Sequence, residues 1–276
     1  MGNFDVERRV LLGCIVDLVE SQAGQPITEA NEWRNNAQAL SKKLFGHFVA
    51  VDVLSGKLTV VLQNDESIEL FDHGSLKVIV RAALETYLVF FYIYCSGNDG
   101  VGQFRHATWQ LGGLTDRQKL YTKMPAHREK LELERLEITR LQEQIAAAPD
   151  FQEYTVGQQS KLLAGEWKIG NSWSNLAKTA GFHEVYFRNI YRYLCGYSHS
   201  SYASTLQVAQ AQHLEEQMLL ANSILGVAVV IMSHFCFSYS SAFPSAMPVL
   251  QKDLEAKRTA AIWRFGREDM AHLYDS

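Results

Sequence analysis

The sequence has few cysteines and lacks the short motifs of several common enzyme classes. Its four cysteines, among 276 residues, form no CxxC pair and have no histidine at metal-ligand spacing. A disulfide framework and a zinc site are therefore not predicted. No Walker A loop, GxGxxG, HExxH or GxSxG motif occurs either, which argues against NTPases, zinc proteases and serine hydrolases. We expect no metal site and no cofactor.

An excess of basic residues is also lacking. The 26 lysines and arginines are outnumbered by 30 acidic residues, so the formal net charge is −4. Because phosphate neutralisation drives nonspecific duplex binding, any contact with nucleic acid must depend on a local patch. Acidic residues precede the first apolar run, and no small-residue cleavage site follows it. We therefore see no secretory signal and expect a cytoplasmic protein with reduced thiols.

Charged residues are absent from one long stretch, between Glu216 and Lys252. A run of that length and hydrophobicity is long enough to span a bilayer. Polar residues such as Asn222 and His234 interrupt it, and no cluster of Lys or Arg flanks it to fix an orientation. We favour a buried central helix. A membrane-associated helical protein that uses residues 218–240 stays open as an alternative.

What the sequence does contain is a series of segments with helical periodicity, separated by short breakers. This pattern predicts an all-α fold, a single multi-helix bundle of about seven to nine helices. We expect one domain over residues 1–276, with N-terminal helices at 4–50, a core at about 70–243, and a C-terminal helix and tail at 245–276. The only segment with strand composition predicts a short β-hairpin near 51–71.

Breakers also set the expected ends of the individual helices. Gly112 and Gly113 are expected to interrupt the helices of residues 101–148. One helix is expected from about residue 204 to Phe243, and a final amphipathic helix from near Pro248. Residues 124–148 mix charges of both signs with apolar residues at heptad-like spacing. They predict a long helical hairpin arm that contacts a protein partner, or else an outer helix of the bundle.

The first polar signal lies inside an apolar helix. The segment LKVIVRAALETYLVFFYIYC is apolar nearly all round, yet it contains Arg81 and Glu85 at positions i and i+4. Burying a charge without a partner is costly. The two side chains must therefore satisfy each other or face a polar cleft.

The second polar signal is Arg192 and His199 in the segment RNIYRYLCGYSHSSY. Seven helical steps of 100° bring the two side chains onto one face, about 10 Å apart along the axis. Tyr191 and Ser198 repeat the same spacing beside them. A histidine can accept a proton from a ribose 2′-hydroxyl, and a guanidinium can stabilise the charge that develops on the phosphate. The alternative is structural, with Arg192 in an ion pair and His199 at a helix C-terminus.

These two helices are the least tolerant of polar residues in the chain, so we predict that they pack together. Arg81, Glu85, Arg192 and His199 would then form one polar cluster. Arg192 and His199 are the candidate catalytic residues, and Arg81, Glu85, Tyr191 and Ser198 are the candidate supporting residues. Two interpretations of this cluster stay open: a structural network and a functional site.

At these residues the chain resembles a family of uncharacterised bacterial proteins known only as a domain of unknown function. The resemblance extends over residues 70–205. It is carried by FDHGSLKVIVRAALETYLVFFYIYCSG, by WQLGGLTDRQ, and by YRYLCGYSHSSY. This resemblance implies no particular activity.

A looser resemblance is to the helical bundles of the HEPN superfamily. Its ribonucleases use an arginine followed, after four to six residues, by a histidine, and six residues separate Arg192 from His199. Such proteins are usually dimers whose paired motifs face each other across a cleft, and some act in stress or phage defence. The resemblance implies a metal-independent ribonuclease that binds RNA as a homodimer. A noncatalytic module that binds a protein or a small ligand is the alternative.

Overall fold

The computed structural model describes residues 4–274, and it confirms the all-α class. Its contacts divide the chain into two compact units. Unit 1 comprises residues 1–91 and 177–276, and unit 2 comprises residues 92–176. The prediction of one domain stays a prediction, because a domain is defined by independent folding.

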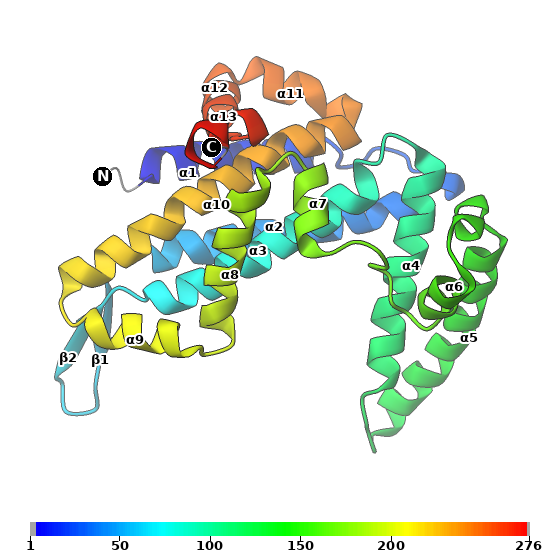
Figure 1. The fold of residues 1–276 in the computed structure, drawn as a ribbon, viewed down its shortest axis with the longest axis horizontal. Helices are drawn as coiled ribbons and strands as arrows, with labels where there is room; N and C mark the ends of the chain where they lie inside the picture. Colours follow the sequence, from blue (N-terminus) through cyan, green and yellow to red (C-terminus); the bar gives the residue numbers. More distant parts are fainter. Residues whose placement is uncertain (1–3, 275–276) are drawn as a thin grey trace. The chain divides into compact units, whose positions relative to one another are not determined.

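Unit 1 is built from helices at both ends of the chain (Figure 1). They are α1 (Asp5–Glu20), the 3-10 helix η1 (Glu29–Arg34), α2 (Asn35–Leu54), α3 (His73–Tyr94), α8 (Glu184–Ser198), α9 (Tyr202–Gln210), α10 (Leu214–Ala242), η3 (Pro244–Ala246), α11 (Met247–Lys252), α12 (Leu254–Trp263) and α13 (Arg267–Tyr274). The last three residues of α3 belong to unit 2, and α7 (Trp173–Thr179) crosses the boundary.

The core of unit 1 is the pair α3 and α10. Phe90 of α3 packs against Phe235 and Tyr239 of α10, with ring centroids 5.1 and 5.9 Å away. The hydroxyls of Tyr87 and Ser238 lie 3.1 Å apart between the same helices. Helix α10 is long and apolar enough to cross a membrane by length and composition, and 72% of its most hydropathic window is buried inside the protein. That burial is the property we predicted for a central helix.

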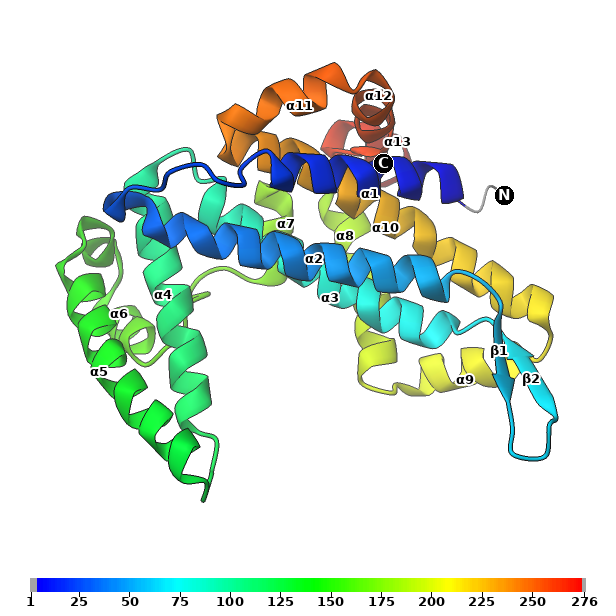
Figure 2. The same cartoon turned by 180° about the vertical axis from the view of Figure 1, so that it is seen from behind.

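Helices α1, α2, α8 and α9 cover this pair from two sides. Helices α8 and α9 lie on the side of α3 that faces the viewer in Figure 1. Helices α1 and α2 lie on the opposite side, as Figure 2 shows from behind. The apolar faces of α1 and α2, with buried residues such as Leu11, Ile15, Leu44 and Phe48, point into the core. The side with α8 and α9 is therefore the one that carries the predicted site.

The predicted hairpin is present between α2 and α3. Strand β1 (Leu58–Val61) pairs antiparallel with β2 (Ser67–Leu70), with Val60 opposite Ile68. The turn between them contains Asp65 in the left-handed region, at φ 61°. This conformation is one that Asp adopts more readily than most residues.

Unit 2 is a helical hairpin with a short helix packed on it. Its elements are α4 (Asp99–Gln118), α5 (Pro125–Ala147), η2 (Pro149–Glu153) and α6 (Val156–Leu163). Its apolar core is formed by Phe104, Ala107, Leu111, Leu141, Ile145, Phe151 and Leu162. The ion pair from Arg117 to Glu134, at 2.8 Å, joins α4 to α5. The long hairpin that we predicted for this region is thus observed.

The prediction of a break at Gly112 and Gly113 was wrong. Helix α4 runs through both residues without interruption. A Cβ atom on Gly112 would lie 2.7 Å from the carbonyl oxygen of Gly165 and 2.8 Å from Trp167. This glycine therefore allows a close approach of two segments of unit 2, and the helix tolerates it because its other contacts compensate for the low propensity.

Two predictions of single helices near the C-terminus were also wrong, because each segment is divided into shorter helices. The helix expected from residue 204 to Phe243 is two helices, because α9 ends at Gln210 and α10 starts at Leu214. The single final helix expected from near Pro248 is instead three short helices, α11, α12 and α13. Asp253 caps α12 by accepting a hydrogen bond from the Ala256 amide at 2.9 Å. Residues 4–274 therefore contain more helices than the seven to nine predicted.

Candidate functional site

Helix α8 is attached to α3 by a polar cluster of three side chains. Arg81 and Glu85 of α3 form an ion pair at 3.0 Å, with side chains 21% and 26% exposed. The Tyr191 hydroxyl of α8 donates a hydrogen bond of 2.6 Å to the Glu85 carboxylate. The Arg81 guanidinium lies 5.7 Å from the centre of the Tyr191 ring. The predicted contact between the two helices is thus made, through Tyr191.

This environment shifts the pKa values of Tyr191 and Arg81. Burial, together with the hydrogen bond to Glu85, raises the pKa of the Tyr191 phenol. Burial disfavours the charged form of Arg81, but the hydrogen bond to Tyr191 and the charge of Glu85 outweigh it, so the pKa of Arg81 is raised. Arg81 therefore stays a cation and Tyr191 a neutral donor across the physiological range.

A second, deeper attachment is made by Lys77, whose exposed fraction is 0%. Its ammonium has three acceptors: His73 Nδ1 at 3.0 Å, the His73 carbonyl at 3.2 Å and the Leu220 carbonyl of α10 at 3.3 Å. It also lies 4.5 Å from the centre of the Tyr197 ring of α8. Burial lowers the pKa of Lys77 to about 8. Lys77 thus connects α3, α8 and α10.

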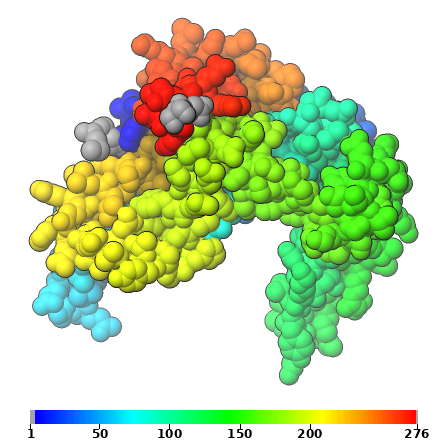
Figure 3. All heavy atoms as spheres, viewed as in Figure 1, coloured from blue at the N-terminus to red at the C-terminus, as the bar shows by residue number. Residues whose placement is uncertain are grey.

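Arg192 lies elsewhere on α8, and His199 is the residue that follows this helix. Both side chains are exposed, and within residues 4–274 neither side chain has a hydrogen-bond or ion-pair partner. In Figure 3 the yellow-green and yellow atoms of α8 and α9 lie at the surface of unit 1. The structure therefore does not bring Arg192 and His199 into one cluster with Arg81 and Glu85. One helical step of 100° separates Arg192 from Tyr191, and that step turns Arg192 away from α3.

The remaining supporting residue, Ser198, does not reach the cluster either. Its hydroxyl donates to the Leu194 carbonyl of the same helix, at 3.3 Å. Bonding to the preceding turn is common for serine within helices. Ser198 is half-buried, as Tyr191 is, but its hydroxyl bonds within α8 and not to Arg81 or Glu85.

His199 is held at a tight corner between α8 and α9. It is the C-cap of α8, with φ −111° and ψ 15°. Ser200 follows in the left-handed region, at φ 51°, a conformation that usually favours glycine. The Ser201 amide closes the corner by donating to the Gly196 carbonyl at 2.8 Å. The backbone at His199 is thus fixed on both sides, although its imidazole is exposed.

A pocket of about 330 Å³ opens beside Arg192, between α8 and α9. Tyr193, Tyr197, Leu206 and Gln207 contribute to its walls. The Tyr197 hydroxyl donates to Gln207 Oε1 at 2.7 Å, and the rings of Tyr193 and Tyr197 lie 5.5 Å apart at 69°. These four residues were not predicted from the sequence as site residues. The signal that could have found them is the i and i+4 spacing of the two tyrosines, seen together with Lys77 in an apolar helix.

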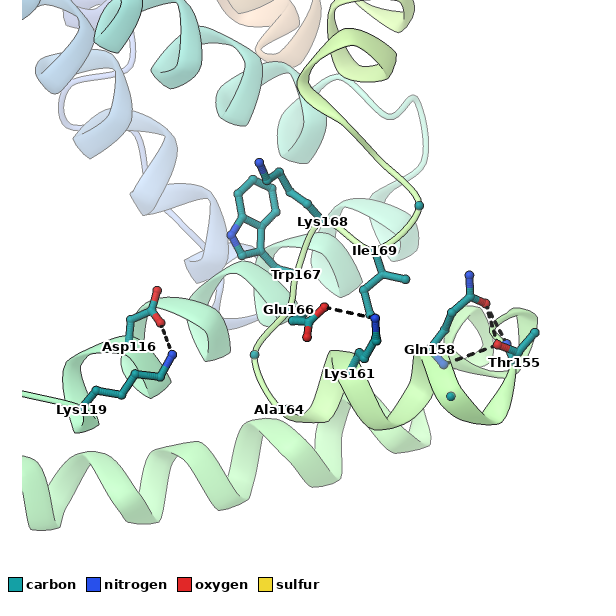
Figure 4. A pocket seen from close by; sticks show the side chains of 13 residues that line it. Asp116, Lys119, Thr155, Gln158, Lys161, Ala164, Glu166, Trp167, Lys168 and Ile169 are labelled. Atoms are coloured by element: carbon teal, nitrogen blue, oxygen red, sulfur yellow. Dashed lines mark hydrogen bonds and ion pairs between the residues drawn. The ribbon is translucent and has the colours of Figure 1, made fainter. Parts of the chain in front are cut away.

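A larger pocket, of about 800 Å³, lies within unit 2 (Figure 4). Most of its charged side chains are paired with each other. Lys119 contacts Asp116 at 2.7 Å, and Lys161 contacts Glu166 at 3.9 Å. None of the residues predicted from sequence line it. Because its charges compensate each other locally, this pocket is a weaker candidate than the exposed face of α8.

Comparison with known proteins identifies a family. The profile of a family of unknown function, DUF5677, matches residues 61–217. No curated protein and no solved structure matches the chain. The matched segment contains α3, α8 and α9, and therefore every residue of the candidate site. Among residues 4–274, no group of three His, Cys, Asp or Glu side chains is placed to hold a metal ion.

Proposed function

Because the chain belongs to DUF5677, a family of unknown function, we propose its function from its own residues: a metal-independent ribonuclease that uses Arg192 and His199. The observation that supports this proposal most strongly is the exposure of both side chains, one within α8 and the other at its C-cap. The ion pair that the structural alternative requires for Arg192 is not formed among residues 4–274, whereas His199 does lie at the C-terminus of α8, as that alternative expects. The HEPN-like spacing of the two residues supports the same chemistry.

The proposed reaction is transfer of an RNA phosphate to the neighbouring 2′-hydroxyl. His199 takes the 2′ proton, the 2′-oxygen bonds to phosphorus, and the bond to the 5′-oxygen breaks. Arg192 stabilises the charge on the non-bridging oxygens. The products are a 2′,3′-cyclic phosphate and a 5′-hydroxyl. The nucleophile comes from the RNA itself, so no hydrolytic water is needed in this step.

The leaving 5′-oxygen requires a proton from the opposite side of the phosphorus, because displacement is in line. One imidazole is poorly placed to serve both sides. We propose that a second copy of the chain presents its own exposed α8 face and donates this proton from its His199. A homodimer of this kind agrees with the organisation of HEPN proteins, and it would act on cytoplasmic RNA in bacterial stress or phage defence.

In this proposal the half-buried cluster of Arg81, Glu85 and Tyr191 has a positioning role, and so has Lys77. Tyr191 is adjacent to Arg192 in the chain and is fixed by Glu85 at 2.6 Å. Lys77 holds the last turn of α8 through Tyr197. These contacts fix the rotation of α8 about its axis, and therefore the direction in which Arg192 and His199 point.

The test is cleavage of single-stranded RNA by the purified protein in EDTA. Wild type should cleave, and His199→Ala should lower the rate by at least about 100-fold, a typical loss for a general base. The matched control is His272→Ala, which removes another exposed histidine of unit 1 and should change nothing. Expression in bacteria should arrest growth with wild type but not with Arg192→Ala. Cleavage that survives His199→Ala would overturn the mechanism.

A noncatalytic interaction module is the second candidate function, and the exposed apolar residues of the hairpin in unit 2 favour it. Leu133 and Leu136 of α5 are 63% and 72% exposed, and Tyr121, before α5, is 83% exposed. Exposed apolar patches of this kind often mark protein contacts. This is the arm of residues 124–148 that the sequence predicts as a contact surface. On this alternative the wild-type protein would neither bind nor cleave RNA.

A further inference from the structure

The pocket between α8 and α9 shares Arg192 with the proposed catalytic pair. We propose that it binds one unstacked base of a single-stranded RNA, whose phosphate then lies at Arg192. This inference rests on the proposed function, since it names the part of the substrate that the same site recognises. Three properties of the pocket support it: its walls are fixed, its surface is aromatic and apolar, and its charge is positive.

The walls are fixed by the corner between the helices. A Cβ atom on Gly196 would lie 2.9 Å from the Ser201 hydroxyl, so the tight corner leaves no room for a side chain at position 196. The Ser204 hydroxyl lies 3.1 Å from the Gly196 carbonyl and holds the first turn of α9 against α8. Because these contacts are internal to the corner, the pocket does not have to form when a ligand arrives.

The aromatic walls are suited to a flat ring. Tyr193 and Tyr197 are both half-buried, so part of each ring is accessible. The position of the Tyr197 ring is fixed by Lys77 behind it, at 4.5 Å, and by Gln207 at its hydroxyl, at 2.7 Å. Leu206 of α9, 41% exposed, adds an apolar wall. Stacking on a tyrosine is a common way in which proteins hold the bases of single-stranded RNA.

Charge and size limit the ligand further. Arg192 is the one charged residue among those of the described chain that line the pocket. An apolar ring slot with a guanidinium at its edge matches a base that is followed by a phosphate. The volume of about 330 Å³ is near the lower end of the usual range for small-ligand sites, about 300–1,000 Å³. It is therefore suited to one nucleotide rather than to a stacked pair.

The test measures binding, so that it does not depend on catalysis. The probe is a short 2′-O-methyl RNA, which lacks the attacking hydroxyl, together with the same oligonucleotide with one base removed at each position in turn. Fluorescence anisotropy gives the dissociation constants. Tyr193→Leu should weaken binding of the intact probe about tenfold, the usual size of one stacking contact. Tyr193→Phe keeps the ring and should bind as wild type does.

The matched control is Tyr202→Leu, which removes a tyrosine of α9 that is 82% exposed and does not line the pocket. It should leave the affinity unchanged. At one probe position, removing the base should weaken binding to the wild-type protein about tenfold as well. Removing the same base should not weaken binding to Tyr193→Leu any further. This non-additivity would assign that base to the Tyr193 ring.

A second variant covers the case in which Tyr193→Leu fails to fold. Leu206→Glu places a carboxylate at an already exposed position of the pocket wall and should also weaken binding about tenfold, by repelling the phosphate. Equal affinities of wild type, Tyr193→Leu and Leu206→Glu would overturn the base pocket. Tight, base-dependent binding by a protein that never cleaves unmodified RNA would support the pocket and overturn the ribonuclease. A wild-type protein that does not bind the probe would overturn both.

Discussion

The two sides of helix α8 carry polar residues in opposite environments. On the buried side Tyr191 is hydrogen-bonded to Glu85, and Tyr197 packs on Lys77. On the exposed side Arg192 and His199 face solvent without a protein partner among the described residues. Polar groups that are buried must be satisfied by the fold, whereas exposed ones need no partner. From this comparison we expect the inward side of α8 to determine stability, and we propose that the exposed side carries the function.

The largest expected effect on stability comes from removing the anion of the half-buried cluster of Arg81, Glu85 and Tyr191. Glu85→Leu leaves Arg81 without its ion pair and Tyr191 without its acceptor. We expect a loss of about 2–4 kcal/mol in the free energy of unfolding, measured by urea denaturation. The control Glu184→Leu removes an exposed carboxylate of α8 that contacts Lys178 at 3.8 Å, and its cost should stay below about 1 kcal/mol.

A double variant of the same cluster tests whether the unpaired charge of Arg81 causes the loss of stability in Glu85→Leu. In the double variant Arg81→Leu with Glu85→Leu, no unpaired charge remains, so part of the lost stability should return. The double variant could instead lose as much free energy of unfolding as the two single variants lose together. The loss in Glu85→Leu would then come from packing and not from an unpaired charge, which would contradict the role given to the inward side of α8.

A smaller effect is expected from the buried ammonium of Lys77. Burial lowers its pKa in the folded state to about 8, below its unfolded value, so the unfolded chain binds more protons between these two values. The Lys77 contribution to stability is therefore unfavourable below pH 8 and improves as the pH rises, by at most about 1.4 kcal/mol per pH unit. Thermal unfolding between pH 7.5 and roughly 9.5 should show this rise.

Lys77→Met should remove the rise, while Lys42→Met, at an exposed lysine of α2, should retain it. Identical pH profiles for wild type and Lys77→Met would mean that Lys77 is protonated alike in the folded and unfolded states. The deep attachment of α8 would then not depend on a desolvated ammonium.

The smallest effect on stability is expected on the exposed side. Arg192→Ala and His199→Ala remove side chains that have no protein partner among residues 4–274. Each should change the free energy of unfolding by no more than about 0.5 kcal/mol. A loss of several kcal/mol in either variant would show that the exposed side is also structural, and would favour the structural alternative for these residues.

Much of the fold could be predicted from the sequence, because periodicity and turn residues are local signals. Ser55-Gly56 and Asn64-Asp65 bracket the observed hairpin, and Asp72 caps α3 through the Ser75 amide at 2.9 Å. The glycines of α4 misled the prediction because the close approach of Gly165 is a tertiary contact, 53 positions away in the chain. Local propensity carries no information about such contacts.

The candidate site was predictable only in part, for a related reason. Spacing shows that Arg192 and His199 share a face of α8, but it does not show which way that face points. The apolar residues that orient α8, Phe187 and Leu194, are both buried, and they lie on the side of Tyr191. Weighing their positions on the helix would have placed Arg192 in solvent. The role of Lys77 was missed because its partners lie in three separate segments of the chain.

The most direct test of the account is the chemical nature of the RNA ends that the protein produces. Wild type should leave 2′,3′-cyclic phosphate and 5′-hydroxyl ends, as attack by the 2′-oxygen requires, and a 2′-deoxy substitution at the cut position should block cleavage. His199→Ala, folded as stably as wild type, should produce neither end. Fragments with 3′-hydroxyl and 5′-phosphate ends, or cyclic ends that persist in His199→Ala, would contradict the assignment of catalysis to the exposed face of α8.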